Sequence, residues 1–279
     1  MPLNLDARNR PLGPLVRDYG PDDIILYALG VGAGFSNLEY CYEDRLKVIP
    51  TFSVAMIFDL FFEAVKAAEL DPEGILHGEQ ELLFHHPIPV EGTLTAKGRI
   101  THFVDKGEGR GALVRVESEA RHSNGENLFT SIMTIFARRD GGFGGSDQLP
   151  KEEIDIPDRE PDHIEPDHPF SNQPLIYRLS GDRFALHVDP AFARAAGFEQ
   201  PIMHGLCTMG FACRALIDTL TPGAPEQVRR LKCRFSKPLY PGVPIETRIW
   251  KTDSNTALWQ TRNAETGDIV INNGICEYR

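Results

Sequence analysis

The chain has 279 residues, of which 41% are hydrophobic and 25% charged, so it has enough apolar material for a folded core. Its formal net charge of −11 argues against a general nucleic-acid-binding protein, although a local cluster of Lys and Arg can still bind an anionic ligand. No apolar run approaches the roughly 18 residues of a membrane span, and neither end of the sequence resembles a secretion or peroxisomal signal, so we expect a cytoplasmic protein.

The first half of the chain combines one apolar helix with the strands that follow it. Residues 54–70 place apolar side chains at helical spacing, which predicts a buried helix. Residues 93–100 and 112–118 alternate between apolar and polar, which is typical of half-buried antiparallel strands. This order predicts a long helix packed on the face of an antiparallel sheet.

Residues 146–172 are rich in Pro, Asp and Glu. Such a segment buries little apolar surface and its like charges repel one another, which predicts an exposed connector. An ordered acidic loop packed over the sheet is the alternative.

The second half repeats the plan of the first. Residues 205–220 predict an apolar helix, and residues 245–250 and 256–261 alternate as strands do. Because the helix is apolar nearly all round, the sheet must wrap it. The expected class is therefore α+β, in the arrangement known as a hotdog fold.

Matching segments recur in the two halves at an offset of 150 or 151 residues. Residues 27–30 match 177–180, Pro50 matches Pro201, and residues 84–88 match 235–239. Several matches in order at nearly one offset indicate two copies of one fold. We therefore predict a double hotdog with repeats at 1–145 and 173–279, joined by the connector 146–172.

Asp182 and His187 lie five residues apart between turn-forming residues, so a loop can bring their side chains together. A carboxylate beside an imidazole is a sound acid–base pair. The alternative is an Asp that caps a helix and a surface His. The matching positions of the first copy carry Gly32 and Asn37, so we expect one active site per chain, built on the second copy.

Gly205 begins the second predicted helix. Its backbone N–H is one of the unpaired donors at the helix start, where the helix dipole favours an oxygen that gains negative charge. Alternatively, this glycine only allows the helix to pack closely.

Other segments complete a recognisable set of motifs. These are residues 27–32, 76–80 and 141–145 in the first copy, and residues 177–182 with His187, 204–208 and 235–238 in the second. With this set the chain resembles type-2 (R)-specific enoyl-CoA hydratases of the MaoC-like family, in the double-hotdog form found as the hydratase part of the peroxisomal multifunctional enzyme.

The resemblance implies reversible hydration of trans-2-enoyl-CoA to (R)-3-hydroxyacyl-CoA. Asp182 and His187 would polarise the attacking water and move a proton to Cα, and the Gly205 N–H would bind the thioester oxygen. No metal or cofactor is expected, because the substrate itself carries coenzyme A, and a homodimer is expected. Contacts with the substrate or with CoA are expected from Gly142, Phe143, Gly144, Phe184, His204, Arg234 and Lys237.

Some of these expected contacts have plainer alternatives. The loop around Phe143 also fits a merely flexible strand exit, and Arg234 and Lys237 also fit a solvated strand end. His77, His85 and His86 are expected to be ordinary structural histidines.

One position departs from the family pattern Gly-Asp-x-Asn-Pro-Leu-His. Phe184 stands at the Asn position and Ala185 at the Pro position, and Phe cannot form the hydrogen bonds of Asn. The outcome is a lower rate, a pocket reshaped for another acyl group, or binding without turnover. Two other functions stay open: an acyl-CoA thioesterase, since hotdog folds also host that chemistry, and a non-catalytic acyl-CoA-binding subunit, because of Phe184.

Overall fold

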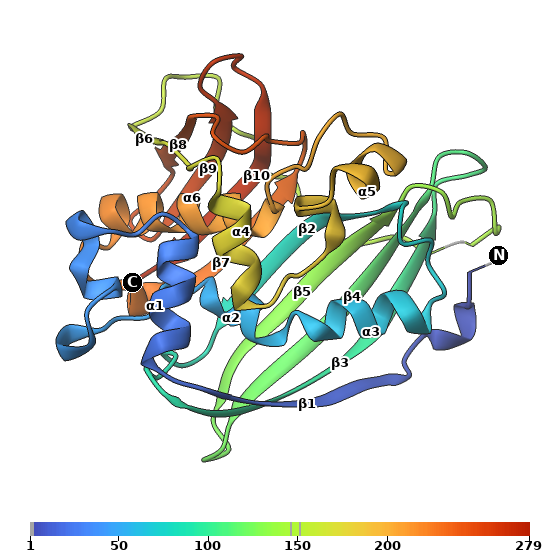
Figure 1. Cartoon of the computed structure of the whole chain (residues 1–279), viewed down its shortest axis with the longest axis horizontal. Coiled ribbons are helices and arrows are strands. Elements are labelled where there is room, and N and C mark those ends of the chain that lie inside the picture. Colours follow the sequence, from blue (N-terminus) through green and yellow to red (C-terminus); the bar gives the residue numbers. More distant parts are fainter. Residues whose placement is uncertain (1–2, 146, 151) are drawn as a thin grey trace.

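Ten antiparallel strands form one continuous sheet in this computed structural model, which describes residues 3–145, 147–150 and 152–279 (Figure 1). The strand order is β1-β3-β4-β5-β2-β7-β10-β9-β8-β6. The strands are β1 (Pro11–Tyr19), β2 (Ile75–Phe84), β3 (Gly92–Asp105), β4 (Ala112–His122), β5 (Asn127–Ala137), β6 (His163–Asp167), β7 (Val228–Phe235), β8 (Ile245–Lys251), β9 (Thr256–Asn263) and β10 (Ile269–Tyr278).

The sheet divides into two halves with the same internal order, and they meet where β2 pairs with β7. In this antiparallel pair Glu81 lies opposite Lys232, and these two residues are separated by 151 positions. That separation equals the offset of the sequence repeat, so a local twofold axis relating the two copies passes between these residues. The predicted α+β double hotdog is confirmed.

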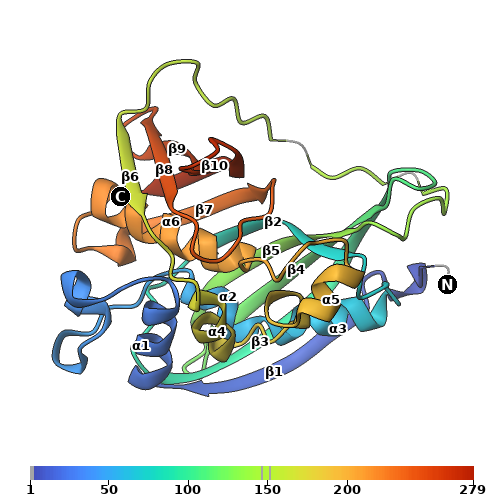
Figure 2. The same ribbon diagram turned by 45° about the horizontal axis from the view of Figure 1, so that its top comes forward.

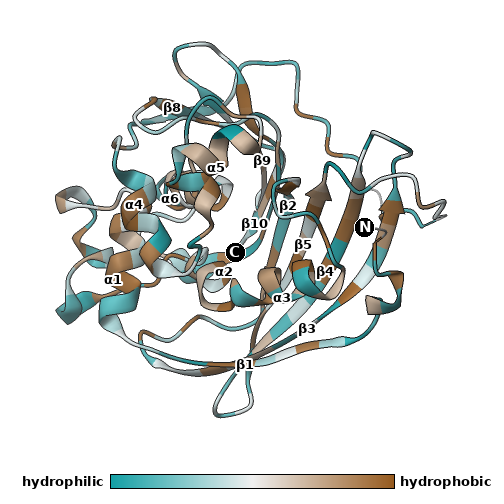
Figure 3. Ribbon diagram, turned by 45° about the vertical axis from the view of Figure 1, so that its right-hand side comes forward, coloured by the Kyte–Doolittle hydropathy of each residue, from teal (hydrophilic) through white to brown (hydrophobic). Residues whose placement is uncertain are grey.

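Each half of the sheet packs against an apolar helix. The predicted helix 205–220 is confirmed as α6 (Gly205–Leu220), most of which is buried. The predicted helix 54–70 is instead two helices, α2 (Phe52–Ile57) and α3 (Asp59–Ala67), which meet at Phe58. Figure 3 shows hydrophobic and hydrophilic residues alternating along β3 and β4, the pattern of strands with one buried face.

The acidic segment 146–172 is not entirely a connector. His163–Asp167 form β6, which pairs with β8 at the edge of the sheet, where Pro166 can be accommodated. Residue 152 is fixed as well, because the Glu152 carboxylate accepts hydrogen bonds from Arg230 and Lys232. Arg159 and Asp162 are likewise bonded to β8, because they accept hydrogen bonds from Trp250 and Lys251, whereas residues 153–158 arch away from the sheet in Figure 2. The second copy thus begins before residue 173, with a strand that its charged sequence did not reveal.

The structure also contains α1 (Pro21–Gly30), α4 (Gln173–Tyr177) and α5 (Pro190–Ala195), of which α1 lies beside α2 and α4. Gln173 donates through Nε2 to the carbonyls of Leu29 and Gly30, which joins the start of α4 to the end of α1. Short 3-10 helices lie at Leu5–Ala7, Phe35–Tyr40, Glu43–Arg45, Arg178–Ser180, Ala185–His187 and Pro225–Gln227. Within the described ranges, no helix is both long and apolar enough to cross a membrane.

Candidate active site

A cavity of about 220 Å³ lies where the two copies meet. Its wall from the first copy is almost entirely apolar, whereas the second copy contributes most of the polar groups. The first copy provides Phe58, Phe61, residues 75–78 and Phe136. The second copy provides Asp182, Phe184, Leu186, His187, Phe198, Ile202, Met203, Gly205, Leu206, Thr208, residues 235–239, Val270 and Ile271.

Asp182 is held tightly against the first copy by the residue before it. Gly181 has a φ of +156°, and a Cβ at this position would lie 2.7 Å from the carbonyl oxygen of Ala55 in α2, so only glycine fits. The Asp182 carboxylate is buried and accepts a 3.1 Å hydrogen bond from the Phe184 backbone N–H. Burial raises the pKa of Asp182 to about 7, against the lowering effect of this hydrogen bond.

His187 ends the 3-10 helix Ala185–His187 and is also buried, so the alternative of a surface histidine is wrong. Its Nδ1 lies 2.9 Å from the carbonyl oxygen of Ile202. A carbonyl only accepts, so Nδ1 carries the hydrogen and Nε2 has a free lone pair. Burial lowers the pKa of His187 to about 4, so the imidazole is neutral near pH 7.

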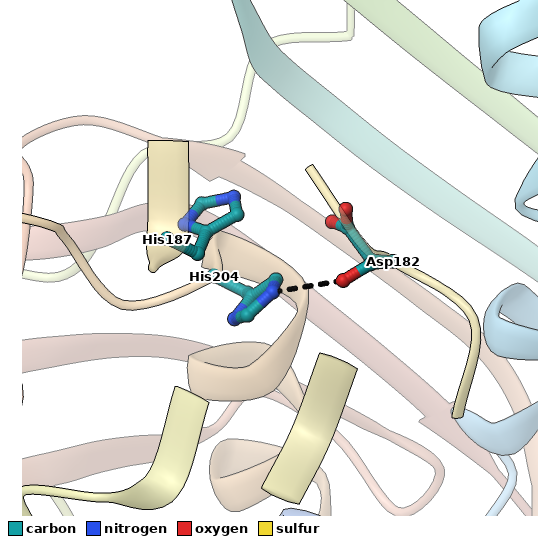
Figure 4. Close-up of side chains that lie close together, drawn as sticks. All are labelled: Asp182, His187 and His204. Atoms are coloured by element: carbon teal, nitrogen blue, oxygen red, sulfur yellow. Dashed lines mark hydrogen bonds between the residues drawn. The ribbon is translucent and has the colours of Figure 1, made fainter. Parts of the chain in front are cut away.

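His204 precedes α6 and supports both members of the pair (Figure 4). Its Nε2–H donates to the backbone carbonyl of Asp182 at 3.1 Å, and its ring stacks on that of His187 with centroids 3.7 Å apart. His204 was predicted to contact the substrate. In the structure its side chain is almost completely buried and does not line the cavity.

Asp182, His187 and His204 are all of residue types that bind metal ions, and one ligand atom from each lies within 4.8 Å of the others. The hydrogen bonds leave one unprotonated ring nitrogen on each histidine, Nε2 of His187 and Nδ1 of His204, so they are compatible with a metal ligand as well as with a base. Nε2 of His204 donates to the Asp182 carbonyl, and Nδ1 of His187 donates to that of Ile202.

Gly205 lines the cavity at the first turn of α6. A Cβ on this residue would lie 2.8 Å from the ring of Phe235 on β7, so the close packing predicted as the alternative role is present. Because Gly205 has no side chain, the backbone at the start of the 16-residue helix α6 is exposed at the cavity wall. The helix dipole favours a developing anion at this position.

Two more predicted residues line the cavity. Phe184 packs edge-on against Phe192, with ring centroids 5.1 Å apart, and its side chain stands beside the acid–base pair. Lys237 lies at the wall and forms an ion pair with Asp268. Its charge is therefore partly compensated before any ligand binds.

The remaining predicted contacts lie outside this cavity. Arg234 lines a different cavity, beside residues 148–150 and 152–154. Gly142 and Gly144 donate their backbone N–H groups to the Asp105 carboxylate, which fixes the glycine-rich loop near the end of β3. These bonds lower the pKa of Asp105. The loop is thus held in place by hydrogen bonds, unlike a merely flexible strand exit.

Sequence reasoning missed two polar residues of the cavity wall. His77 on β2 was expected to be an ordinary structural histidine, yet its ring lies in the wall between Phe61 and Phe235. Thr208 lies one turn into α6, with its hydroxyl 3.4 Å from the His204 carbonyl. The signal in the sequence that could have identified them is that His77 and Thr208 lie within the motif segments 76–80 and 204–208.

Residues 18–139 match the family described as MFE-2 hydratase 2 N-terminal domain, and residues 152–274 match the MaoC like domain. The chain is 38% identical to "Probable enoyl-CoA hydratase 2" of Dictyostelium discoideum, covering 96% of this chain and 93% of that protein. It is 36% identical to "3-hydroxyacyl-thioester dehydratase Y" of Mycobacterium tuberculosis, covering 95% and 94%.

Solved structures are similar over the same length. A MaoC-like dehydratase from Phytophthora capsici superposes with a TM-score of 0.85 at 31% identity, covering 99% of this chain and 97% of that one. The peroxisomal multifunctional enzyme type 2 from Drosophila melanogaster gives a TM-score of 0.82 at 33% identity. There the match covers 95% of this chain and 48% of the larger enzyme.

Proposed function

Because the chain belongs to the MaoC-like enoyl-CoA hydratase 2 family, we propose that it hydrates trans-2-enoyl-CoA to (R)-3-hydroxyacyl-CoA through Asp182 and His187. The observation that carries this proposal is the pair itself, buried at the junction of the two copies with opposite pKa shifts. A carboxyl group with a pKa of about 7 can donate a proton near neutrality, and a neutral imidazole can accept one.

Water enters between the two side chains and its oxygen attacks C3 of the enoyl group. The free Nε2 of His187 takes the proton that the water loses, and protonated Asp182 delivers a proton to C2. One water molecule is thereby added across the double bond. The His187 imidazolium, whose pKa is lowered to about 4, then returns its proton to the Asp182 carboxylate, whose pKa is about 7, so the pair is reset without an external base.

Attack at C3 pushes electrons onto the thioester oxygen, which becomes enolate-like. We assign stabilisation of this oxygen to the Gly205 N–H at the start of α6, in the cavity wall. The apolar wall formed by Phe58, Phe61 and Phe136 would receive the acyl chain. The first copy thus shapes the site while the second performs the chemistry.

The test follows loss of enoyl absorbance with crotonyl-CoA and longer enoyl-CoAs, together with the configuration of the 3-hydroxy product. Asp182→Asn and His187→Gln should each lower kcat by about 10²–10⁴-fold, the usual contribution of a general acid or base. A folded protein without turnover on any chain length would overturn the proposal. Release of free CoA thiol would instead indicate the thioesterase.

Matched controls lie in the same part of the chain. Asp189→Asn changes an exposed carboxylate that caps α5, seven residues from Asp182, and an amide oxygen can still accept the capping hydrogen bonds. His168→Gln changes an exposed imidazole. Both should keep the wild-type rate, so a similar loss in a control would point to general misfolding.

The homodimer and the cytoplasmic location stay predictions. Light scattering that gives the mass of one chain would contradict the dimer.

A further inference from the structure

A second cavity, of about 230 Å³, lies at the opposite end of the β2–β7 pair from the candidate active site. Its wall is mostly apolar and comes from three places in the chain: residues 46–50, the segment after β2, and the start of β7. Phe84, Ile88 and Val228 are typical of its apolar lining. Nothing in the proposed hydration uses this cavity.

The local twofold axis relates this cavity to the catalytic one. Eight of its thirteen lining residues, shifted by the repeat offset of 151, become residues that line the candidate active site. Phe84 corresponds to Phe235, and residues 86–88 correspond to residues 237–239. Lys47 corresponds to Phe198. In the reverse direction, Glu226, Val228 and Arg229 correspond to Ile75, His77 and Gly78. The second cavity is therefore the counterpart, in the first copy, of the candidate active site.

In the first copy, other residues occupy the positions that correspond to the acid–base pair. Gly32 stands where the second copy has Asp182, and a Cβ there would meet the Phe211 ring at 2.2 Å. Asn37, at the position of His187, accepts a 2.9 Å hydrogen bond from the buried guanidinium of Arg214. A thioester bound in this cavity would not meet a counterpart of the Asp182–His187 pair, on which the proposed hydration depends.

The walls of the two cavities differ in their charged residues. Lys47 corresponds to Phe198 and Arg229 corresponds to Gly78, so the second cavity has a cation at two positions where the catalytic cavity has an uncharged residue, while His86 stands at the position of Lys237. Nε of Arg229 is buried without a hydrogen-bond partner among the described residues, and Lys47 donates only to the Gly223 carbonyl. Against these cations the wall carries one carboxylate, that of Glu226.

We propose that this cavity is a second, non-catalytic site that binds a fatty carboxylate of short or medium chain. Lys47 and Arg229 bind the carboxylate through charge-assisted hydrogen bonds, and the apolar wall around Ile88 covers the chain. This inference does not depend on the proposed hydration, because its residues and its ligand are separate from those of the acid–base pair.

The test uses methyl-labelled full-length protein and records NMR shifts in both cavities at once. Methyl groups of Ile88 and Val90 report on the second cavity, and those of Ile202 and Ile271 report on the candidate active site. Octanoate, 1-octanol and inorganic phosphate are titrated separately. Octanoate has both an alkyl chain and an anionic group, 1-octanol has an alkyl chain without a charge, and phosphate is an anion without an alkyl chain. Octanoate should shift Ile88 and Val90 saturably, at least tenfold more tightly than either other probe.

Charge removal gives the second arm. The double variant Lys47→Met with Arg229→Met should weaken octanoate binding at Ile88 by about tenfold or more, equivalent to loss of a charge-assisted hydrogen bond. The matched variant Lys237→Met, in the other cavity, should leave it unchanged. Equal affinity for octanoate and octanol, or octanoate shifts confined to Ile202 and Ile271, would overturn the proposal on the wild-type protein alone.

Discussion

The imidazole rings of His187 and His204 lie face to face in the buried site, with centroids 3.7 Å apart and planes 26° from parallel. Burial lowers the pKa of both residues, so the stack is formed by two neutral rings that do not repel each other. His204 also donates to the carbonyl of Asp182. One residue outside the proposed acid–base pair therefore fixes the ring plane of the base and the backbone of the acid.

Replacing His204 should lower kcat without a matching rise in KM. His204→Phe keeps an aromatic ring against His187 but loses the bond to Asp182, and His204→Gln keeps a donor but loses the stack. Each variant should lose about tenfold in kcat, because a buried hydrogen bond is worth about 1–1.5 kcal/mol and tenfold in rate is about 1.4 kcal/mol. Steady-state kinetics with crotonyl-CoA, together with circular dichroism, would measure this. An unchanged kcat in both variants would show that His204 only fills space.

The rate of hydration should follow a bell-shaped pH profile, in which each limb is displaced from the ordinary pKa of the residue that causes it. The proposed acid, Asp182, must be protonated, so kcat/KM should fall above about pH 7. The proposed base, His187, must be neutral, so activity should persist well below the ordinary histidine pKa and fall only near pH 4. Initial rates between pH 3.5 and 9 test this. An acidic limb near the ordinary histidine value, or no alkaline limb, would contradict the assignment of roles.

Asp182→Asn should stabilise the fold at alkaline pH. The folded-state pKa of about 7 exceeds the ordinary value of 3.8, so the folded protein binds this proton more tightly and its free energy of unfolding falls as the pH rises between these values. An amide has no such penalty. We expect a gain of roughly 2–4 kcal/mol at pH 8 from a shift of about three units, and no gain below pH 4. Urea unfolding at both pH values measures it, and equal gains at the two would refute the titration argument.

The sequence predicted the architecture well where a periodic pattern was repeated. Residues 205–220 form α6 with the expected bounds, and the strand predicted at 112–118 begins β4. The repeat offset of 151 was visible in the sequence and reappears as the register of Glu81 against Lys232. Side chains that alternate or recur along one element leave such a signal, because the element itself decides which face is buried.

Features that depend on contacts between distant segments were not predictable. The acidic sequence of residues 163–167 conceals β6, because an edge strand needs few apolar residues and gains its hydrogen bonds from β8. The supporting position of His204 depends on Asp182, 22 residues away, and its motif alone suggested a substrate contact. Arg234 likewise faces a different cavity, since neighbouring strand residues point to opposite faces of the sheet.

Phe184→Asn should raise the rate and change the choice of substrate. The Phe184 ring lines the cavity beside Asp182 and His187 but has no group that can hold a water molecule. An amide at this position can donate to the attacking water, so kcat with crotonyl-CoA should rise by roughly tenfold, equal to about 1.4 kcal/mol. The smaller side chain also opens the wall against Phe192, so the preference among enoyl-CoA chain lengths should shift toward bulkier acyl groups.

Phe184→Leu is the matched control, because it removes the ring without supplying an amide. Both variants lose the contacts with Phe192 and Phe62 and should be destabilised by about 1–3 kcal/mol, as for other large-to-small changes at partly buried sites. Only the Asn variant should gain rate with crotonyl-CoA, whereas both should accept bulkier chains. If the two variants share the same change in kcat, space and not hydrogen bonding explains the effect of Phe184. If kcat falls in the Asn variant alone, the aromatic ring itself contributes to the reaction, and Phe184 is an adaptation of this site to its own substrate.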